Sequence, residues 1–125
     1  DENFFLYLEN TDLCLRQKNN NEKIYVFKDS KIRHIGSYFT KQDLSKNLEY
    51  LRNWHWMWSK FYFNKKHSGY LSALIKTFHN LISAILKYFF YTLLFNKHRK
   101  IIYKMRFLGL LNSMIGKKSF LRPKN

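Results

Sequence analysis

The spacing of apolar residues along the chain changes near residue 40. Before that point, short apolar runs alternate with polar stretches, and the runs at 4–8, 23–27 and 30–36 predict three short strands. Beyond it, apolar residues recur in steps of three and four, which predicts a mostly helical region over 41–115. The pattern therefore predicts a small α/β unit followed by helices.

The first predicted strand ends at an acidic turn, which is the first candidate site. Glu9 follows the strand, and Asp12 comes three residues later. Asn10 and Thr11, between them, favour the start of a helix. Open α/β folds bind ligands at the carboxyl ends of their strands, so these carboxylates are candidates for catalysis or binding. The helix dipole alone also favours acids at a helix N-terminus, and on spacing alone such capping is the commoner role.

Residues 69–95 predict one long amphipathic helix. Its apolar stripe consists of Leu71, Leu74, Ile75, Phe78, Ile82, Ile85, Leu86, Phe89 and Leu93. Polar residues such as Lys76 and Lys87 interrupt the segment, and it has no run of about 18 apolar residues that could span a bilayer. The pattern is typical of a helix that lies in the membrane interface. A pair of core-facing helices with solvated basic backs would give the same stripe.

Charge is distributed unevenly along the chain. Residues 1–49 hold all eight acids and eight of the 23 Lys and Arg residues, so the formal charge of +15 lies within residues 50–125. This asymmetry predicts a polyanionic partner, for which nucleic acid, anionic lipid and pyrophosphate all qualify. The absence of acids favours a membrane, because the helices of soluble proteins usually mix both signs. The cations expected at the membrane surface are Lys76, Lys87, Lys97, Arg99, Lys100 and Lys104.

The N-terminal third resembles a known family of enzymes. Residues 2–36 are similar to the second half of the catalytic domain of family 2 glycosyltransferases, of the rhamnosyltransferase-like bacterial type. The matching positions are Phe4, Phe5, Tyr7, Glu9, Asp12, Leu13, Arg16, His34 and Gly36. Looser similarity continues over 52–58, 60–69 and 108–123, so the resemblance extends along nearly the whole chain.

The resemblance implies a fold class and a division of the chain. It implies an α/β fold, in which residues 1–40 are the C-terminal portion of a GT-A (nucleotide-diphospho-sugar transferase) catalytic domain. Residues 41–125 would be a helical, basic, membrane-associated extension. A donor-binding half with an Asp-x-Asp metal motif would precede Asp1, and this chain contains no such motif. We therefore expect the chain to be the C-terminal part of a longer enzyme and to be inactive alone.

The resemblance also implies roles for individual residues. The family usually has Asp, the expected catalytic base, at position 10, but the amide of Asn10 cannot accept a proton at neutral pH. Either Glu9 or Asp12 would then be the base, or the chain would be a variant that binds substrate and has weak chemistry. His34 would help to hold a divalent cation, Mg²⁺ or Mn²⁺, bound mainly by the missing half. The substrate-binding residues would be Arg16, Arg52, Lys66 and His67.

The implied function is inverting sugar transfer in the synthesis of bacterial surface polysaccharide. The donor would be a nucleotide-sugar and the acceptor a lipid-linked or other glycan. The enzyme would bind peripherally to the cytoplasmic face of the inner membrane, and no nucleic-acid partner is expected. Two alternatives remain open on the residues alone. One is a small basic nucleic-acid-binding module, and the other is a membrane-surface protein without enzymatic activity.

Overall fold

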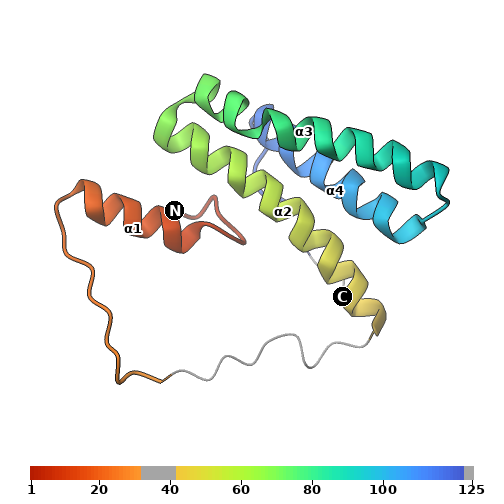
Figure 1. Cartoon of the computed structure of the whole chain (residues 1–125). Helices are drawn as coiled ribbons and strands as arrows, with labels where there is room; N and C mark the ends of the chain where they lie inside the picture. Colours follow the sequence, from red (N-terminus) through yellow and green to blue (C-terminus); the bar gives the residue numbers. More distant parts are fainter. Residues whose placement is uncertain (32–41, 123–125) are drawn as a thin grey trace.

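In the computed structural model, which describes residues 1–31 and 42–122, the regular structure consists of helices (Figure 1). The four helices are α1 (Glu9–Asn19), α2 (Gln42–Ser68), α3 (Tyr70–Leu93) and α4 (Lys97–Met114). The prediction of a mostly helical region over 41–115 is confirmed, because α2, α3 and α4 fill almost all of it. The helix expected after the acidic turn is also present, and it begins at Glu9.

The expected α/β fold class, a C-terminal fragment of a GT-A fold, is wrong. The described residues contain no strand. Residues 4–8 form a bend in which Tyr7 and Leu8 have φ angles of 69° and 67°, and this left-handed conformation does not fit a strand. Residues 23–27 are exposed and irregular. A strand is stable only when neighbouring strands pair with it, so an apolar run without a partner takes another conformation. The third expected strand, 30–36, lies mostly outside the described residues.

Helices α2, α3 and α4 pack together as a bundle. Figure 1 shows α3 and α4 running side by side, with α2 crossing beneath them. The centre of the bundle is a buried apolar cluster of Met57, Phe61, Ala73 and Leu110. Gly109 lets α2 and α4 approach closely, because a Cβ atom at this position would lie 2.2 Å from the Trp54 carbonyl oxygen. The contact between these two helices therefore depends on a residue without a side chain.

The links between the helices of the bundle are short. Gly69 alone separates α2 from α3, and its φ of 84° suits glycine. Three residues, 94–96, join α3 to α4, and the side chain of Asn96 accepts a hydrogen bond of 3.0 Å from the Arg99 backbone N–H. This is an ordinary N-cap. These links place the start of α4 beside the end of α3.

Both ends of the described chain pack on α2. Phe4 is buried and contacts Tyr62 edge to face, with ring centroids 5.0 Å apart. The segment after α4 returns along α2, where Trp58 Nε1 donates a 2.9 Å hydrogen bond to the Lys117 carbonyl. His55 is fully buried between these segments, with Nε2 2.8 Å from the Leu121 carbonyl oxygen. Helix α2 is thus the element on which the rest of the molecule assembles.

Candidate functional site

The acidic turn is held against the C-terminal end of α2 by one buried carboxylate. Asp12 has no exposed surface. Its Oδ1 accepts hydrogen bonds from Lys66 Nζ and His67 Nε2, each at 2.8 Å. Its Oδ2 accepts a 3.0 Å hydrogen bond from Arg16 Nε, one turn along α1. The structure therefore brings together four of the predicted site residues, from two helices that lie far apart in the sequence.

The electrostatics of this cluster keep Asp12 ionised. Burial raises the pKa of its carboxyl group, but the hydrogen bonds from Lys66, His67 and Arg16 outweigh burial and lower the pKa to about 2. A general base works best with a pKa near the working pH and an oxygen free to reach the substrate. Asp12 has neither property in this arrangement. Its geometry suits a positioning role, in which it fixes α1 on the bundle.

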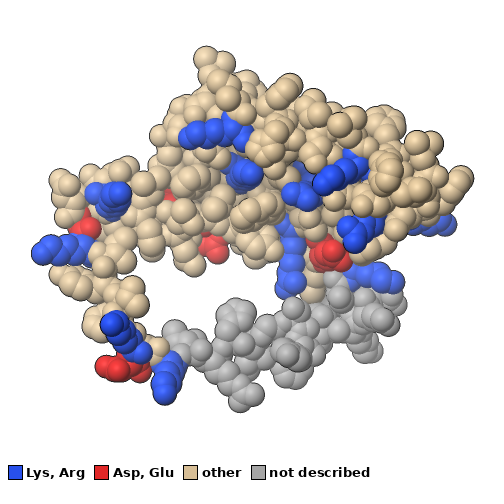
Figure 2. Space-filling view, viewed as in Figure 1, with Lys and Arg blue, Asp and Glu red and all other residues tan. Residues whose placement is uncertain are grey.

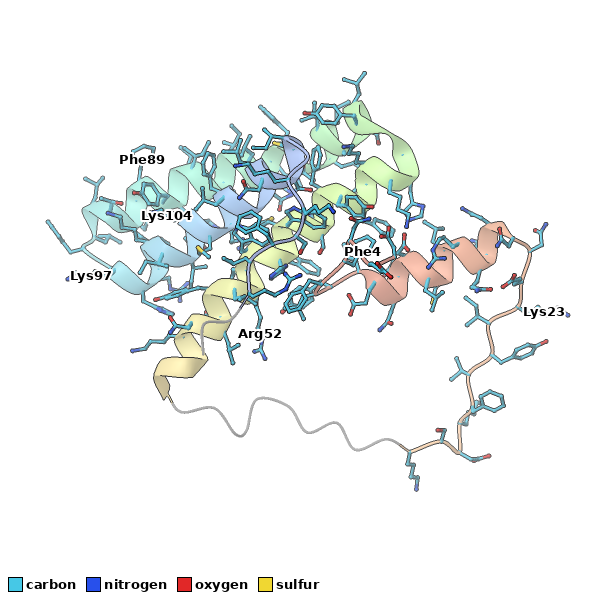
Figure 3. The ribbon with its side chains drawn as sticks, turned by 180° about the vertical axis from the view of Figure 1, so that it is seen from behind. Phe4, Lys23, Arg52, Phe89, Lys97 and Lys104 are labelled. Atoms are coloured by element: carbon cyan, nitrogen blue, oxygen red, sulfur yellow. The ribbon has the colours of Figure 1, made fainter. Side chains whose placement is uncertain are left out.

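The remaining residues of the acidic turn are open to solvent. Glu9 and Asn10 begin α1, and both are exposed. Glu9 is therefore the solvent-accessible carboxylate of the predicted pair. Arg52, the fourth expected substrate-binding residue, is exposed on α2 (Figure 3). It lies about 21 Å along the helix axis from Lys66, at 1.5 Å per residue, and so is not part of this cluster.

The expected metal ligand cannot be placed. His34 lies outside the described residues. Within 1–31 and 42–122, no group of three His, Cys, Asp or Glu side chains could hold a metal ion. The buried carboxylate of the acidic turn, Asp12, is already held by three cationic or potentially cationic groups. No metal-dependent step is therefore assigned to these residues.

The second candidate site is the outer surface of α3. Seven large apolar side chains on one side of this helix are exposed: Leu71, Ile75, Phe78, Ile82, Leu86, Phe89 and Leu93. We call this set the α3 stripe. Its members recur every three or four residues, so they lie within a narrow band along the helix. The side of α3 that is buried carries the smaller residues Ala73, Thr77 and Ala84. The helix thus packs through small residues together with the partly buried Leu74 and Leu81, and the α3 stripe faces outward.

The exposure of these side chains argues against one explanation of the predicted stripe, a helix whose apolar side faces the core. A core-facing helix would bury Phe78, Leu86 and Leu93, yet these side chains are 61%, 64% and 77% exposed. Leu74 and Ile85, which belong to the predicted stripe, are partly buried and lie nearer the bundle. The stripe continues into the turn after α3, where Phe95 is 91% exposed. Exposed apolar patches of this kind mark a surface that binds a partner or a membrane.

The cations predicted for the membrane surface lie on α3 and α4, near this stripe. In Figure 2 the upper part of the molecule, formed by α3, shows blue Lys and Arg side chains among tan ones and no red acid. Several of these cations lie over aromatic rings. Lys87 Nζ is 5.4 Å from the Tyr103 ring centroid, and Lys100 Nζ is 5.4 Å from that of Tyr88. Lys97 begins α4 beside the turn (Figure 3). Helices α3 and α4 themselves contain no acid, and the one acid paired with them among the described residues is Glu49 of α2, whose Oε2 lies 3.3 Å from His98 Nε2.

No protein-family model, curated protein or solved structure matches the chain. Among the helices of the described residues, none is both long enough and apolar enough to cross a membrane.

Proposed function

We propose that this chain belongs to an enzyme that works at an anionic membrane surface, and that α3 and α4 hold it there. The observation that carries the proposal is the α3 stripe, exposed along the length of a helix in a half of the chain that contains no acid. An amphipathic helix binds a membrane by burying its apolar side in the bilayer, while neighbouring basic residues attract the anionic headgroups.

The two contributions to binding are of similar size. Full burial of one large apolar side chain stabilises by about 1.5–3 kcal/mol, so partial burial of the seven stripe residues gives several kcal/mol. Each Lys or Arg near an anionic surface adds about 1 kcal/mol, and seven Lys and Arg residues lie on α3 and α4. Salt screens the electrostatic part and leaves the apolar part. Binding should therefore weaken as salt rises without disappearing.

Vesicle sedimentation of the 125-residue chain tests this proposal. The chain should sediment with vesicles that contain phosphatidylglycerol and less with vesicles of phosphatidylcholine alone. Changing Phe78, Ile82, Leu86 and Phe89 to Ser should remove the salt-resistant binding. Changing Lys76, Lys97, Arg99 and Lys104 to Gln should remove the salt-sensitive binding.

A matched control changes four exposed lysines outside the bundle, Lys18, Lys23, Lys28 and Lys31, to Gln. This variant loses the same charge and should bind vesicles like the unchanged chain. If the chain stays in the supernatant with anionic vesicles at low salt, the proposal is wrong. Tight and steeply salt-dependent binding to duplex DNA would instead support the nucleic-acid alternative.

We also propose that the reaction of the intact enzyme is inverting sugar transfer. The donor would be a nucleotide-sugar and the acceptor a lipid-linked or other glycan, as in the synthesis of bacterial surface polysaccharide at the cytoplasmic face of the inner membrane. The support is the similarity of residues 2–36 to family 2 glycosyltransferases. Glu9 would take the proton of the acceptor hydroxyl as it attacks the anomeric carbon, while Asp12 holds the helix that carries Glu9.

Sugar transfer by the intact enzyme tests this second part. Glu9→Gln should lower kcat about 10²–10⁴-fold, as expected when a general base is lost. Glu22→Gln changes an exposed acid just beyond the other end of α1 and should leave kcat unchanged. An unchanged kcat in Glu9→Gln would show that the base is another residue.

A further inference from the structure

A groove between α3 and α4 opens beside the α3 stripe. It has a volume of about 390 Å³ and is lined by Ile85, Tyr88, Phe89, Lys104, Phe107 and Leu108. Lys104 is the one charged residue among these six. Phe89 belongs to both the groove and the stripe, so the groove is continuous with the surface proposed to contact the membrane. Figure 3 shows Phe89 on α3 and Lys104 on the adjacent helix α4.

The lining of the groove suits a hydrocarbon chain. A volume of 390 Å³ holds about a dozen groups the size of a methylene, at roughly the 30 Å³ that a water molecule occupies in the liquid. Phe107 and Leu108 from α4 and Ile85 from α3 all line this volume, so a chain could contact apolar side chains of both helices. A pocket of this size and composition is typical of sites that bind small apolar ligands.

Positive charge gathers toward one part of the groove. Lys100 precedes Lys104 by one turn of α4, so the two side chains lie on the same side of that helix. Lys100 Nζ is 5.4 Å from the ring centroid of Tyr88, itself a lining residue. Phe107 and Leu108 lie farther along α4. The groove therefore has Lys104 in its lining and the Lys100 ammonium group beside its Tyr88 ring, whereas Phe107 and Leu108 give it an apolar part.

We propose that this groove binds one lipid phosphate, with its hydrocarbon chain against Phe107, Leu108 and Ile85 and its phosphate at Lys100 and Lys104. The charge of the ligand complements the two lysines, and the chain complements the apolar lining. A lipid could enter from the bilayer because the groove is continuous with the stripe. The inference rests on the proposed function, and it selects a lipid-linked phosphate as the class of acceptor.

Titration with decyl phosphate, kept below its micelle concentration, tests the site by calorimetry. Decyl phosphate should bind saturably to one site per chain, at least about tenfold more tightly than decanol or inorganic phosphate, which is about 1.4 kcal/mol. Changing Lys100 and Lys104 to Gln should remove this preference over decanol. Leu108→Trp should fill the groove and abolish binding of both decyl ligands.

A matched variant separates this inference from the membrane proposal. Ile75→Trp places the same side chain on the stripe outside the groove, and it should retain decyl phosphate binding. Leu108→Trp should still sediment with anionic vesicles, because the stripe is intact. If Leu108→Trp binds decyl phosphate like the unchanged chain, or if decanol binds equally well, the groove is not a lipid-phosphate site. The lipid-phosphate proposal would also be contradicted if the chain dimerises as its concentration rises and Leu108→Trp abolishes the dimer. In that case a second chain would occupy the groove.

Discussion

The buried carboxylate of Asp12 permits a quantitative prediction about how α1 is held on the bundle. Asp12→Asn keeps the shape of the side chain but removes the charge that Lys66, His67 and Arg16 share. The pKa of Asp12 falls from 3.8 to about 2 because of these partners. At about 1.36 kcal/mol per pKa unit, the ionised form stabilises the folded state by about 2 kcal/mol at neutral pH. The substitution should cost about this amount.

The cost should fall mainly on α1, because Asp12 connects this helix to the end of α2. Amide hydrogen exchange of the chain resolves the effect by helix. In Asp12→Asn, protection of the α1 amides should fall about thirtyfold, the factor that corresponds to about 2 kcal/mol, while that of the α3 amides stays unchanged. The control is Glu9→Gln, which changes an exposed acid on the same helix and should alter the protection of the α1 amides little. Equal protection in Asp12→Asn and the unchanged chain would refute the argument.

The pH dependence of the same contact has a definite sign. The pKa of Asp12 in the folded state lies below its ordinary value, so the unfolded state binds the proton more readily. The stabilisation is therefore complete above about pH 4 and is lost as the pH falls toward 2. The difference in α1 protection between the unchanged chain and Asp12→Asn should shrink over that range. A constant difference down to pH 2 would mean that the carboxylate charge is not its source.

Two further predictions concern the packing around α2. Gly109→Ala should lower the free energy of unfolding by about 1–3 kcal/mol, because the added Cβ would lie 2.2 Å from the Trp54 carbonyl oxygen; a urea midpoint equal to that of the unchanged chain would contradict this. Burial lowers the pKa of His55 from 6.5, so its contribution to stability should be lost as the pH falls below that value. The slope of unfolding free energy against pH between 5 and 7 should decrease in His55→Gln; a slope that does not change would rule out His55 as the titrating group.

The helices of this protein could be predicted from the sequence, whereas the strands predicted at 4–8 and 23–27 do not form. Helical periodicity is a local property, and α2, α3 and α4 follow it. A strand depends on partners elsewhere in the chain. The aromatic run at 4–8 has the composition of a strand, but Phe4 is buried against Tyr62 of α2 and the backbone turns at Tyr7 and Leu8. Composition alone does not show whether an aromatic side chain is buried within a sheet or, like Phe4, against a helix.

The candidate sites were predictable to different degrees. The sequence allowed each of Asp12, Lys66 and His67 to be selected individually. Their contact could not be predicted, because Lys66 and His67 lie 54 and 55 positions beyond Asp12 in the sequence and come close to it only in the fold. The α3 stripe was visible as a pattern, although spacing did not indicate whether it faces the core or solvent. The small residues Ala73, Thr77 and Ala84 are the signal that could have answered this, because small side chains let helices approach closely.

The depth of the α3 stripe in a membrane is the most direct test of the central claim. The chain has a single cysteine, Cys14, which is exposed on α1 and gives a control position for a nitroxide label. The test position is Ile82→Cys in a Cys14→Ser background. With anionic vesicles, the label at 82 should become accessible to oxygen and protected from a water-soluble nickel complex, while the label at 14 stays accessible to nickel. Equal accessibility of both labels to nickel would contradict the account.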